Sequence, residues 1–241
     1  MNIKEYRQVE SLEEAWELNQ KKNNRIIGGM LWMKMNKRPI QTAIDLSGLG
    51  LNQIEETEDE FRIGCMTSLR ALEENPELNI YTNGAMKEAL RSIVGVQFRN
   101  LATVGGSIYG RYGFSDVLTM FLVMDSYVEL YKGGVISLAE YAKMPYDNDI
   151  LVRLIVKKQK DVSFSYQSVR NSRTDFPVLT LAASFGAEDA PKFAVGARPG
   201  RAVLVSDSSE VITGTNLRGS AAYRKHLVEV LMKRAICEHA Q

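Results

Sequence analysis

Residues 99–116 read RNLATVGGSIYGRYGFSD, and this stretch decides how the rest of the chain is interpreted. It holds Gly105, Gly106, Gly110 and Gly113, four of the 18 glycines, between an amphipathic run and an apolar run. A glycine pair lets the backbone pass where a Cβ would collide, and it leaves amide groups free to face an anion. Because adjacent glycines more often form an ordinary turn, the stretch alone indicates only a candidate anion-binding loop.

The composition is typical of a soluble globular protein. The chain has 241 residues, 45% hydrophobic and 24% charged, which is enough for one large domain or two to three smaller lobes. Its 30 Lys and Arg nearly balance its 29 Asp and Glu, so no overall basic field attracts nucleic acid or a membrane surface. The longest apolar run, 117–124, is far shorter than the roughly 20 residues of a membrane span, and MNIKEYRQVE has no apolar signal region. We therefore expect a cytoplasmic protein with no nucleic-acid or membrane partner.

Cysteine and histidine are scarce. Cys65 and Cys237 are far apart in the sequence, so their spacing indicates neither a disulfide framework nor a metal site. His226 and His239 both lie near the C-terminus, where a surface role is favoured over a hydrolase triad. We predict no catalytic side chain and no metal ligand, so an enzymatic role would depend on a bound cofactor.

The N-terminal region is predicted to form a lobe of βαβ type. A capping box that begins at Ser11 predicts a helix, and apolar residues predict strands over 25–27 and 42–46. The first of these strands runs directly into Gly28-Gly29. Ligands of α/β sheets bind at the carboxyl ends of strands, so this glycine pair is a second candidate site.

The rest of the chain predicts helices and antiparallel strands. Residues 47–60 are expected to form a loop or a hairpin, 84–94 a helix, and 127–137 a hairpin with a tight glycine turn. The last third contains three β-type runs and then a helix over 220–238, which predicts an α+β lobe with three strands; the runs are 164–169, 176–185 and 192–205.

The two glycine pairs together are a more credible phosphate cradle than either alone. Gly28-Gly29 and Gly105-Gly106 are each predicted to follow a short apolar strand, in different lobes. The spacing is neither the Rossmann fingerprint G-x-G-x-x-G nor a P-loop. A bound dinucleotide would therefore be held by another scheme.

The combination of these motifs resembles the FAD-binding, or medium, subunit of molybdenum hydroxylases, the xanthine dehydrogenase and carbon monoxide dehydrogenase family. TVGGS and SAAYRKHLVEVLMKRA are the most specific matches. The matching segments cover essentially the whole chain, in order: IIGGMLWMK at 26–34, RNLATVGGSI at 99–108, Asp116, NDILVRLIV at 148–156, RNSRTDFPVLTLAASF at 170–185 and LRGSAAYRKHLVEVLMKRAI at 217–236.

The resemblance implies an α+β fold. Two α/β lobes of the vanillyl-alcohol-oxidase type, residues 1–54 and 55–158, would clasp FAD, and residues 159–241 would form a C-terminal α+β domain with a three-stranded sheet and helices. It also implies a set of cofactor contacts. These are Arg25, Ile26, Ile27, Gly28, Gly29, Met30, Leu31 and Trp32 around the first part of FAD; Thr103, Val104, Gly105, Gly106 and Ser107 at the pyrophosphate; Asp116 at the ribose or adenine end; and Ile93 and Leu151 as apolar contacts.

The sequence departs from the family pattern in three places. Ser107 replaces the usual Asn, and Ser168 stands where the animal enzymes have a Lys beside the flavin. Residues 109–114, YGRYGF, replace small residues; their aromatic and arginine side chains would stack on a flavin or a partner subunit, or take an ordinary core or surface place. Two interpretations are open for Arg170 and Arg173: local salt bridges, or contacts with FAD or a partner. The local interpretation is favoured, because surface arginines usually pair locally.

The resemblance implies an electron-transfer flavoprotein subunit. Electrons from hydroxylation of a purine or similar heterocycle would pass from a molybdenum cofactor through [2Fe-2S] clusters, both on partner subunits, to FAD and then to NAD+. Two alternatives remain open at this point: a stand-alone flavin oxidoreductase of the same fold, and a flavin-less assembly subunit. An isolated chain with flavin absorbance would exclude the second alternative.

Overall fold

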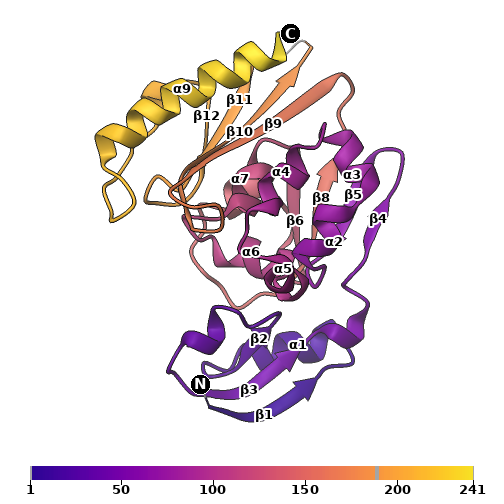
Figure 1. Ribbon diagram of the computed structural model, residues 1–241. Coiled ribbons are helices and arrows are strands. Elements are labelled where there is room, and N and C mark those ends of the chain that lie inside the picture. Colours follow the sequence, from indigo (N-terminus) through magenta and orange to yellow (C-terminus); the bar gives the residue numbers. More distant parts are fainter. Residues whose placement is uncertain (1, 188–189, 241) are drawn as a thin grey trace.

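The computed structural model describes residues 2–187 and 190–240, whose strands form three sheets stacked along the molecule (Figure 1). The N-terminal sheet lies at one end, and a five-stranded sheet with its helices occupies the middle. A four-stranded sheet with the long helix α9 (Ala221–His239) forms the other end.

The N-terminal sheet is parallel and has the order β1-β3-β2 (Ile3–Gln8, Ile40–Asp45 and Arg25–Ile27). Helix α1 (Leu12–Asn19) begins where predicted, because the Ser11 hydroxyl accepts the Glu14 N–H at 3.1 Å. Strand β1 was not predicted, since its polar sequence IKEYRQ lies at an exposed edge and carries no apolar alternation. Two short 3-10 turns, η1 (Met33–Met35) and η2 (Ser47–Leu49), follow β2 and β3.

The middle sheet is antiparallel throughout. Residues 54–64 form a hairpin, one of the two structures expected for this region. The predicted hairpin with a glycine turn is present at β6 and β7 (Ser126–Leu130 and Gly134–Ser137), where Gly134 has φ 70°. The strand order is β4 (Ile54–Glu56), β5 (Glu60–Gly64), β8 (Leu151–Lys157), β6 (Ser126–Leu130) and β7 (Gly134–Ser137).

Short helices cover this sheet and carry much of the buried core. The predicted helix 84–94 is shorter than expected and ends at Arg91, because Val94 has the left-handed φ of 49°. Pro76 starts its own helix behind the Asn75 cap. The helices are α2 (Leu69–Glu74), α3 (Pro76–Tyr81), α4 (Ala85–Arg91), α5 (Val96–Leu101), α6 (Val104–Gly110), α7 (Asp116–Leu122) and α8 (Leu138–Tyr141).

The glycine-rich stretch is helical, so the prediction that Gly105-Gly106 follows an apolar strand is wrong. Both glycines lie in the first turn of α6, and helix α5 precedes them. The Thr103 hydroxyl caps α6 by accepting the Gly106 N–H at 3.1 Å. The weak helix propensity of glycine is overridden by packing: a Cβ on Gly105 would lie 2.7 Å from the carbonyl oxygen of Cys65.

The C-terminal sheet has four strands, so the expected three-stranded sheet is corrected. Its order is β12-β11-β10-β9, all antiparallel: Val203–Val205, Lys192–Gly196, Pro177–Gly186 and Val162–Arg170. The predicted single run 192–205 is interrupted because Ala197 adopts φ 56° and its N–H donates to the Gly113 carbonyl at 2.7 Å.

Both faces of the C-terminal sheet are covered. Helix α9 packs on β10 and β9 from outside, and α4 and α7 pack on the inner face (Figure 1). This explains why β10 is buried from Pro177 to Phe185. The inner contact joins the C-terminal sheet to α4 and α7, the helices before and after the glycine-rich stretch. A 3-10 turn η3 (Ser208–Glu210) precedes α9.

Candidate functional site

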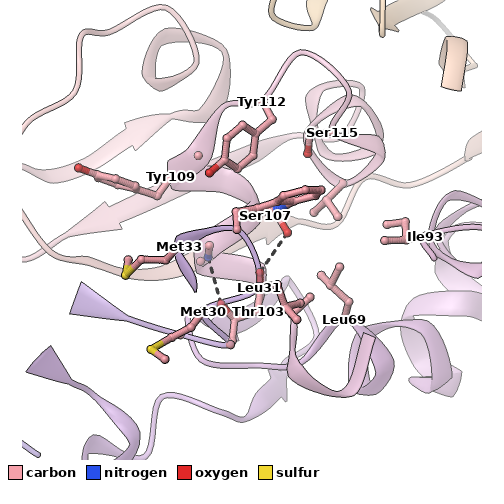
Figure 2. A pocket seen from close by; sticks show the side chains of 18 of the residues that line it. Met30, Leu31, Met33, Leu69, Ile93, Thr103, Ser107, Tyr109, Tyr112 and Ser115 are labelled. Atoms are coloured by element: carbon pink, nitrogen blue, oxygen red, sulfur yellow. Dashed lines mark hydrogen bonds between the residues drawn. The ribbon is translucent and has the colours of Figure 1, made fainter. Parts of the chain in front are cut away.

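One cavity lies where the three sheets meet. It encloses about 460 Å³, within the roughly 300–1,000 Å³ of ordinary ligand pockets. Its wall comes from the loop after β2, the α4–α5 turn, α6 with the residues that follow it, and the start of β8. The end of β9 and the connection from β9 to β10, residues 170–176, complete it. We call residues 28–35, which follow β2, the first loop. Figure 2 shows Met30, Leu31 and Met33 of the first loop beside Thr103 and Ser107 of the glycine-rich stretch.

The two glycine regions touch each other directly. A Cβ on Gly29 would lie 1.8 Å from the carbonyl oxygen of Leu101, and one on Gly28 would lie 2.7 Å from the Thr103 hydroxyl oxygen. Real Cβ contacts are never this short, so only glycine permits the first loop to lie against the end of α5. The glycine pair therefore sets the distance between the N-terminal and middle parts of the cavity wall.

The first loop has main-chain donors without partners. Across residues 2–187 and 190–240, no hydrogen-bond acceptor is found for the N–H groups of Gly29, Met30, Leu31 and Trp32. Met30 has φ 56°, so the chain turns sharply there. Consecutive free amides in such a turn form a concave site for an anion.

The second glycine pair differs, because its amides are already used. The N–H groups of Val104 and Gly105 donate to the carbonyls of Thr67 and Cys65, at 2.9 and 2.8 Å. Those of Gly106 and Ser107 donate to the hydroxyl and carbonyl oxygens of Thr103, both at 3.1 Å. The expectation that glycines at 105–106 leave amides free for an anion is therefore not met; Gly105 serves close packing instead.

Five aromatic side chains gather at the cavity. Trp32 packs on Phe98, Tyr112, Phe114 and Phe176, with ring centroids 5.5–6.2 Å apart. Tyr112 and Phe114 stack on each other at 5.2 Å, and Phe114 meets Phe176 at 4.3 Å. All five line the cavity. Tyr112 and Phe114, which belong to the 109–114 segment that departs from the family pattern, therefore lie at the site and not in the core. The arrangement suits a flat, partly apolar ring system.

Asp116 joins the middle part to the C-terminal sheet. Its carboxylate accepts the Tyr166 hydroxyl at 2.6 Å and the Arg170 guanidinium at 2.5 Å. Burial raises the pKa of Asp116, while Arg170 and Tyr166 act in the opposite direction. Arg170 also donates to the Asp175 carbonyl at 2.6 Å, and the Asp175 carboxylate pairs with Arg218 at 2.7 Å. Arg170 therefore forms a salt bridge, but with a residue 54 positions away and at the cavity wall, so the expectation of a local pair is not met.

Arg111 lies inside the wall near one end of the cavity. It is buried with φ 42°, its guanidinium lies 3.9 Å from the centroid of the Tyr141 ring, and it donates to the Pro145 carbonyl at 3.4 Å. The hydroxyls of Tyr109 and Tyr146, which line the cavity, donate to main-chain carbonyls across this end at 3.0 and 2.7 Å. Tyr109 and Arg111, also from the 109–114 segment, thus help to hold residues 142–149 against the end of α6.

The structure places nearly all of the predicted contact residues at the cavity. Val104 is the exception, because its side chain is fully buried away from the lining. Some lining residues were not predicted, among them Phe98, Phe176 and Cys65. No spacing rule indicates Phe98 or Phe176, and Cys65 was considered only as a disulfide or metal-site residue. The predicted residues that line the cavity are Arg25, Ile26, Ile27, Gly28, Gly29, Met30, Leu31, Trp32, Ile93, Thr103, Gly105, Gly106, Ser107, Asp116 and Leu151.

The cavity wall includes the thiol of Cys65 as well as charged side chains such as Arg25 and Asp149. Burial raises the pKa of Cys65 to about 12, so its thiol stays protonated near neutral pH. In the described part of the chain, no three side chains of His, Cys, Asp or Glu come together as a metal site would require. Within the same residues, no helix is long and apolar enough to cross a membrane.

Comparison with known proteins identifies the family. The family described as "FAD binding domain in molybdopterin dehydrogenase" matches residues 2–158, so this chain belongs to it. The Escherichia coli (strain K12) protein YgfM is 24% identical over 249 residues, covering 95% of this chain and 94% of YgfM. The nicotine 6-hydroxylase medium subunit of Paenarthrobacter nicotinovorans is 24% identical over 97% of this chain and 96% of that subunit.

A solved structure has the same fold. A chain of the reconstituted CO dehydrogenase from Oligotropha carboxidovorans superposes with a TM-score of 0.85 at 17% identity, over 97% of this chain and 96% of that chain. The α+β fold class predicted from the sequence resemblance is confirmed, while the C-terminal sheet has four strands in place of the expected three.

Proposed function

We propose that this chain is the FAD-binding electron-transfer subunit of a molybdenum hydroxylase complex. The observation that carries the proposal is the row of free amides from Gly29 to Trp32, which lines the cavity of a chain belonging to an FAD-binding family. We further propose that residues 1–54, 55–158 and 159–241 act as the three units that enclose the cofactor.

The residues of the cavity fit a flavin dinucleotide. A pyrophosphate carries two negative charges, and the first loop offers consecutive unpaired N–H groups at the cavity surface. The Thr103 hydroxyl lies beside this loop and can donate a further hydrogen bond, whereas the Ser107 hydroxyl already donates to the Thr103 carbonyl at 3.1 Å. We therefore assign the pyrophosphate chiefly to Gly29–Trp32, and give the 103–107 segment the role of backing surface and hydroxyl donor.

The remaining contacts are assigned by chemistry. A carboxylate has about four acceptor positions, so Asp116 can accept a ribose or adenine hydrogen bond in addition to those from Tyr166 and Arg170. Trp32, Ile93 and Leu151 supply apolar surface for the rings. When bound, FAD supplies the redox chemistry, and the side chains of this chain bind it, orient it and exclude water.

The partners follow from what this chain lacks. A [2Fe-2S] cluster is held by four Cys ligands, and this chain has two cysteines in all. We therefore assign the iron–sulfur clusters and the molybdenum cofactor to separate subunits. The relation to a nicotine 6-hydroxylase medium subunit supports a nitrogen heterocycle, such as a purine, as the substrate of the complex, and we propose NAD+ as the final acceptor. The complex is proposed to act in the cytoplasm, without nucleic-acid or membrane partners.

Native co-purification tests this proposal. A tagged chain isolated gently from its source cells is expected to carry FAD and to bring down one chain with iron and one with molybdenum. Adding a purine or related heterocycle should bleach the flavin absorbance, and NAD+ should restore it. A flavin-free chain that still brings down the metal-containing partners would instead support an assembly role, and the absence of a molybdenum-containing partner would contradict the complex. Turnover of a small alcohol or acid by the isolated chain would support a stand-alone oxidoreductase.

A further inference from the structure

The cavity wall contains a strained turn between α4 and α5. Val94 has φ 49°, a left-handed conformation that a β-branched side chain rarely adopts. The residue is 46% exposed, so no dense packing holds it there. Ile93 and Val94 both line the cavity. Such strain persists only where surrounding groups fix it.

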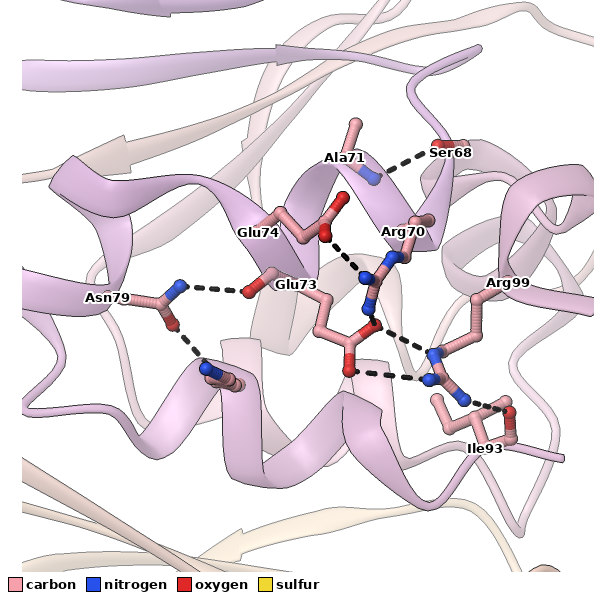
Figure 3. Close-up of polar contacts among 9 residues, drawn as sticks. Ser68, Arg70, Ala71, Glu73, Glu74, Asn79, Ile93 and Arg99 are labelled. Carbon is pink, nitrogen blue, oxygen red and sulfur yellow. Dashed lines mark hydrogen bonds and ion pairs between the residues drawn. The ribbon is translucent and has the colours of Figure 1, made fainter. Parts of the chain in front are cut away.

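Arg99 on α5 is the group that fixes this turn. Its side chain is buried, and its Nη1 donates to the carbonyl oxygen of Ile93 at 3.0 Å (Figure 3). That carbonyl belongs to the peptide that leads into Val94. The hydrogen bond therefore determines the orientation of the peptide plane at which the left-handed turn begins.

Glu73 on α2 holds Arg99 in place. Its carboxylate accepts Arg99 Nε at 2.8 Å and Nη2 at 3.4 Å, and both side chains are buried. Arg70 donates to the same carboxylate at 2.8 Å, and the Glu73 carbonyl accepts the Asn79 side chain (Figure 3). Burial disfavours the charge, but the two arginines outweigh it and hold the pKa of Glu73 below its usual value. A two-point pair fixes the guanidinium plane, which a single contact would not.

We infer that Arg99 is a positioning residue for cofactor binding. Acting through the Ile93 carbonyl, it holds the Ile93–Val94 turn in the shape against which the flavin dinucleotide packs. This inference rests on the proposed function, because the cavity is taken to hold FAD. A purely structural role, in which the ion pair only fastens α5 to α2, predicts different behaviour for the variants below.

The decisive variant is Arg99→Lys. A lysine keeps a positive charge for Glu73, but its single nitrogen cannot also reach the Ile93 carbonyl. We expect the FAD dissociation constant to rise about tenfold, the size expected for a lost charge-assisted hydrogen bond, and the urea midpoint to fall as well, because the lost contacts are buried. Arg70→Met is the matched control, because Arg70 binds the same carboxylate without contacting the turn; FAD affinity should stay within about twofold, the effect of a partly exposed pair.

Val94→Gly tests the mechanism by rescue. Glycine adopts positive φ without strain, so the turn no longer depends on Arg99. In the Val94→Gly background, Arg99→Lys should weaken FAD binding by less than about threefold, which a double-mutant cycle would report as coupling between the two positions. The same loss in both backgrounds would overturn the inference.

Hydrogen exchange of the flavin-free protein gives a readout independent of the cofactor. Amides of residues 92–96 should exchange faster in Arg99→Lys and at the wild-type rate in Arg70→Met. Equal acceleration in both variants would assign the pair to general packing, and no change in either would remove the positioning role. A folded wild-type chain that binds no FAD would contradict the proposed function and the inferred role of Arg99 in cofactor binding. The hydrogen-exchange result would still decide whether Arg99 holds the Ile93–Val94 turn.

Discussion

The two sides of the cavity are built in different ways. On the N-terminal side, Gly28-Gly29 lies against the backbone of residues 101–103, so main chain meets main chain. On the C-terminal side, the residues that line the cavity make contact through side chains: Asp116 pairs with Arg170, and Phe114 packs on Phe176. The main-chain contact of Gly113 with Ala197 lies outside this lining. The main-chain contact of Gly28-Gly29 leaves no room for one added carbon. The side-chain contacts can lose atoms while the cavity wall stays in place. The N-terminal side should therefore respond to substitution much more steeply.

The largest effect is expected for Gly29→Ala. The new Cβ would collide with the Leu101 carbonyl, and backbone cannot rotate away as a side chain does. Overpacking of this kind costs about 1–3 kcal/mol. Because the first loop would also move away from α6, FAD affinity should fall by more than about 100-fold, as isothermal titration would measure.

Gly214→Ala is the control for that variant. Gly214 lies outside the cavity lining, and the atom nearest to a Cβ there would be Pro199 Cδ at 3.3 Å, a tight contact but not a collision. FAD affinity should match the wild type, and the urea midpoint should change little. A Gly29→Ala chain that binds FAD normally would show that the N-terminal side of the cavity tolerates substitution as well as the C-terminal side. That result would contradict the proposed difference between the two sides.

Asp116→Asn should have an intermediate effect. The amide keeps the size of the side chain but lacks the charge that Arg170 and the cofactor hydroxyl require. Affinity for FAD should fall about tenfold, in line with a hydrogen bond to a charged group. Asp207→Asn, in the cap of η3 far along the chain, keeps its capping role and should leave binding unchanged. Equal affinity in the wild type and Asp116→Asn would remove Asp116 from the contact set.

Phe176→Leu should have a smaller effect. Aromatic pairs contribute about 0.5–1.5 kcal/mol beyond their buried area, so FAD affinity should fall about three- to tenfold. Phe185→Leu serves as the control, because Phe185 is buried in the C-terminal core against Phe193. Both variants should lower thermal stability, and only Phe176→Leu should weaken FAD binding. A larger loss of affinity than that of Gly29→Ala would reverse the order proposed for the two sides.

The smallest effect concerns Cys65, which lies under Gly105 in the cavity wall. Its pKa is raised to about 12 by burial, so at pH 8 it remains a protonated, inaccessible thiol, while Cys237 is exposed. Maleimide at pH 8 should label the folded chain once, at Cys237, and twice after unfolding. Rapid labelling of Cys65 in the folded state would show that the contact between Gly105 and Cys65 opens readily.

The sequence predicted the elements with strong local signals. Gly134 marked a hairpin turn, Ser11 a helix cap, and the apolar spacing of 220–238 the final helix, and each is present. The resemblance placed almost every proposed contact residue at one cavity. These successes depend on short-range chemistry or on motifs that follow the chain in order.

The failures share a physical cause, since each depends on contacts between distant residues. Nothing in TVGGS indicates that Cys65 lies close enough to require Gly105, or that helix α6 uses the amides that a free loop would offer. The break at Ala197 likewise depends on a hydrogen bond to Gly113. The pairing of Arg99 with Glu73 joins residues 26 positions apart in the sequence. Tertiary packing decides such features.

Titration of the purified chain with FAD and with FMN tests the central claim most directly. The free amides of Gly29–Trp32 are proposed to bind a pyrophosphate, which FMN lacks. One FAD per chain should bind, with FMN at least about tenfold weaker because it forfeits contacts to the second phosphate and the adenosine. FMN binding as tight as that of FAD, or no FAD binding by a folded wild-type chain, would contradict the account.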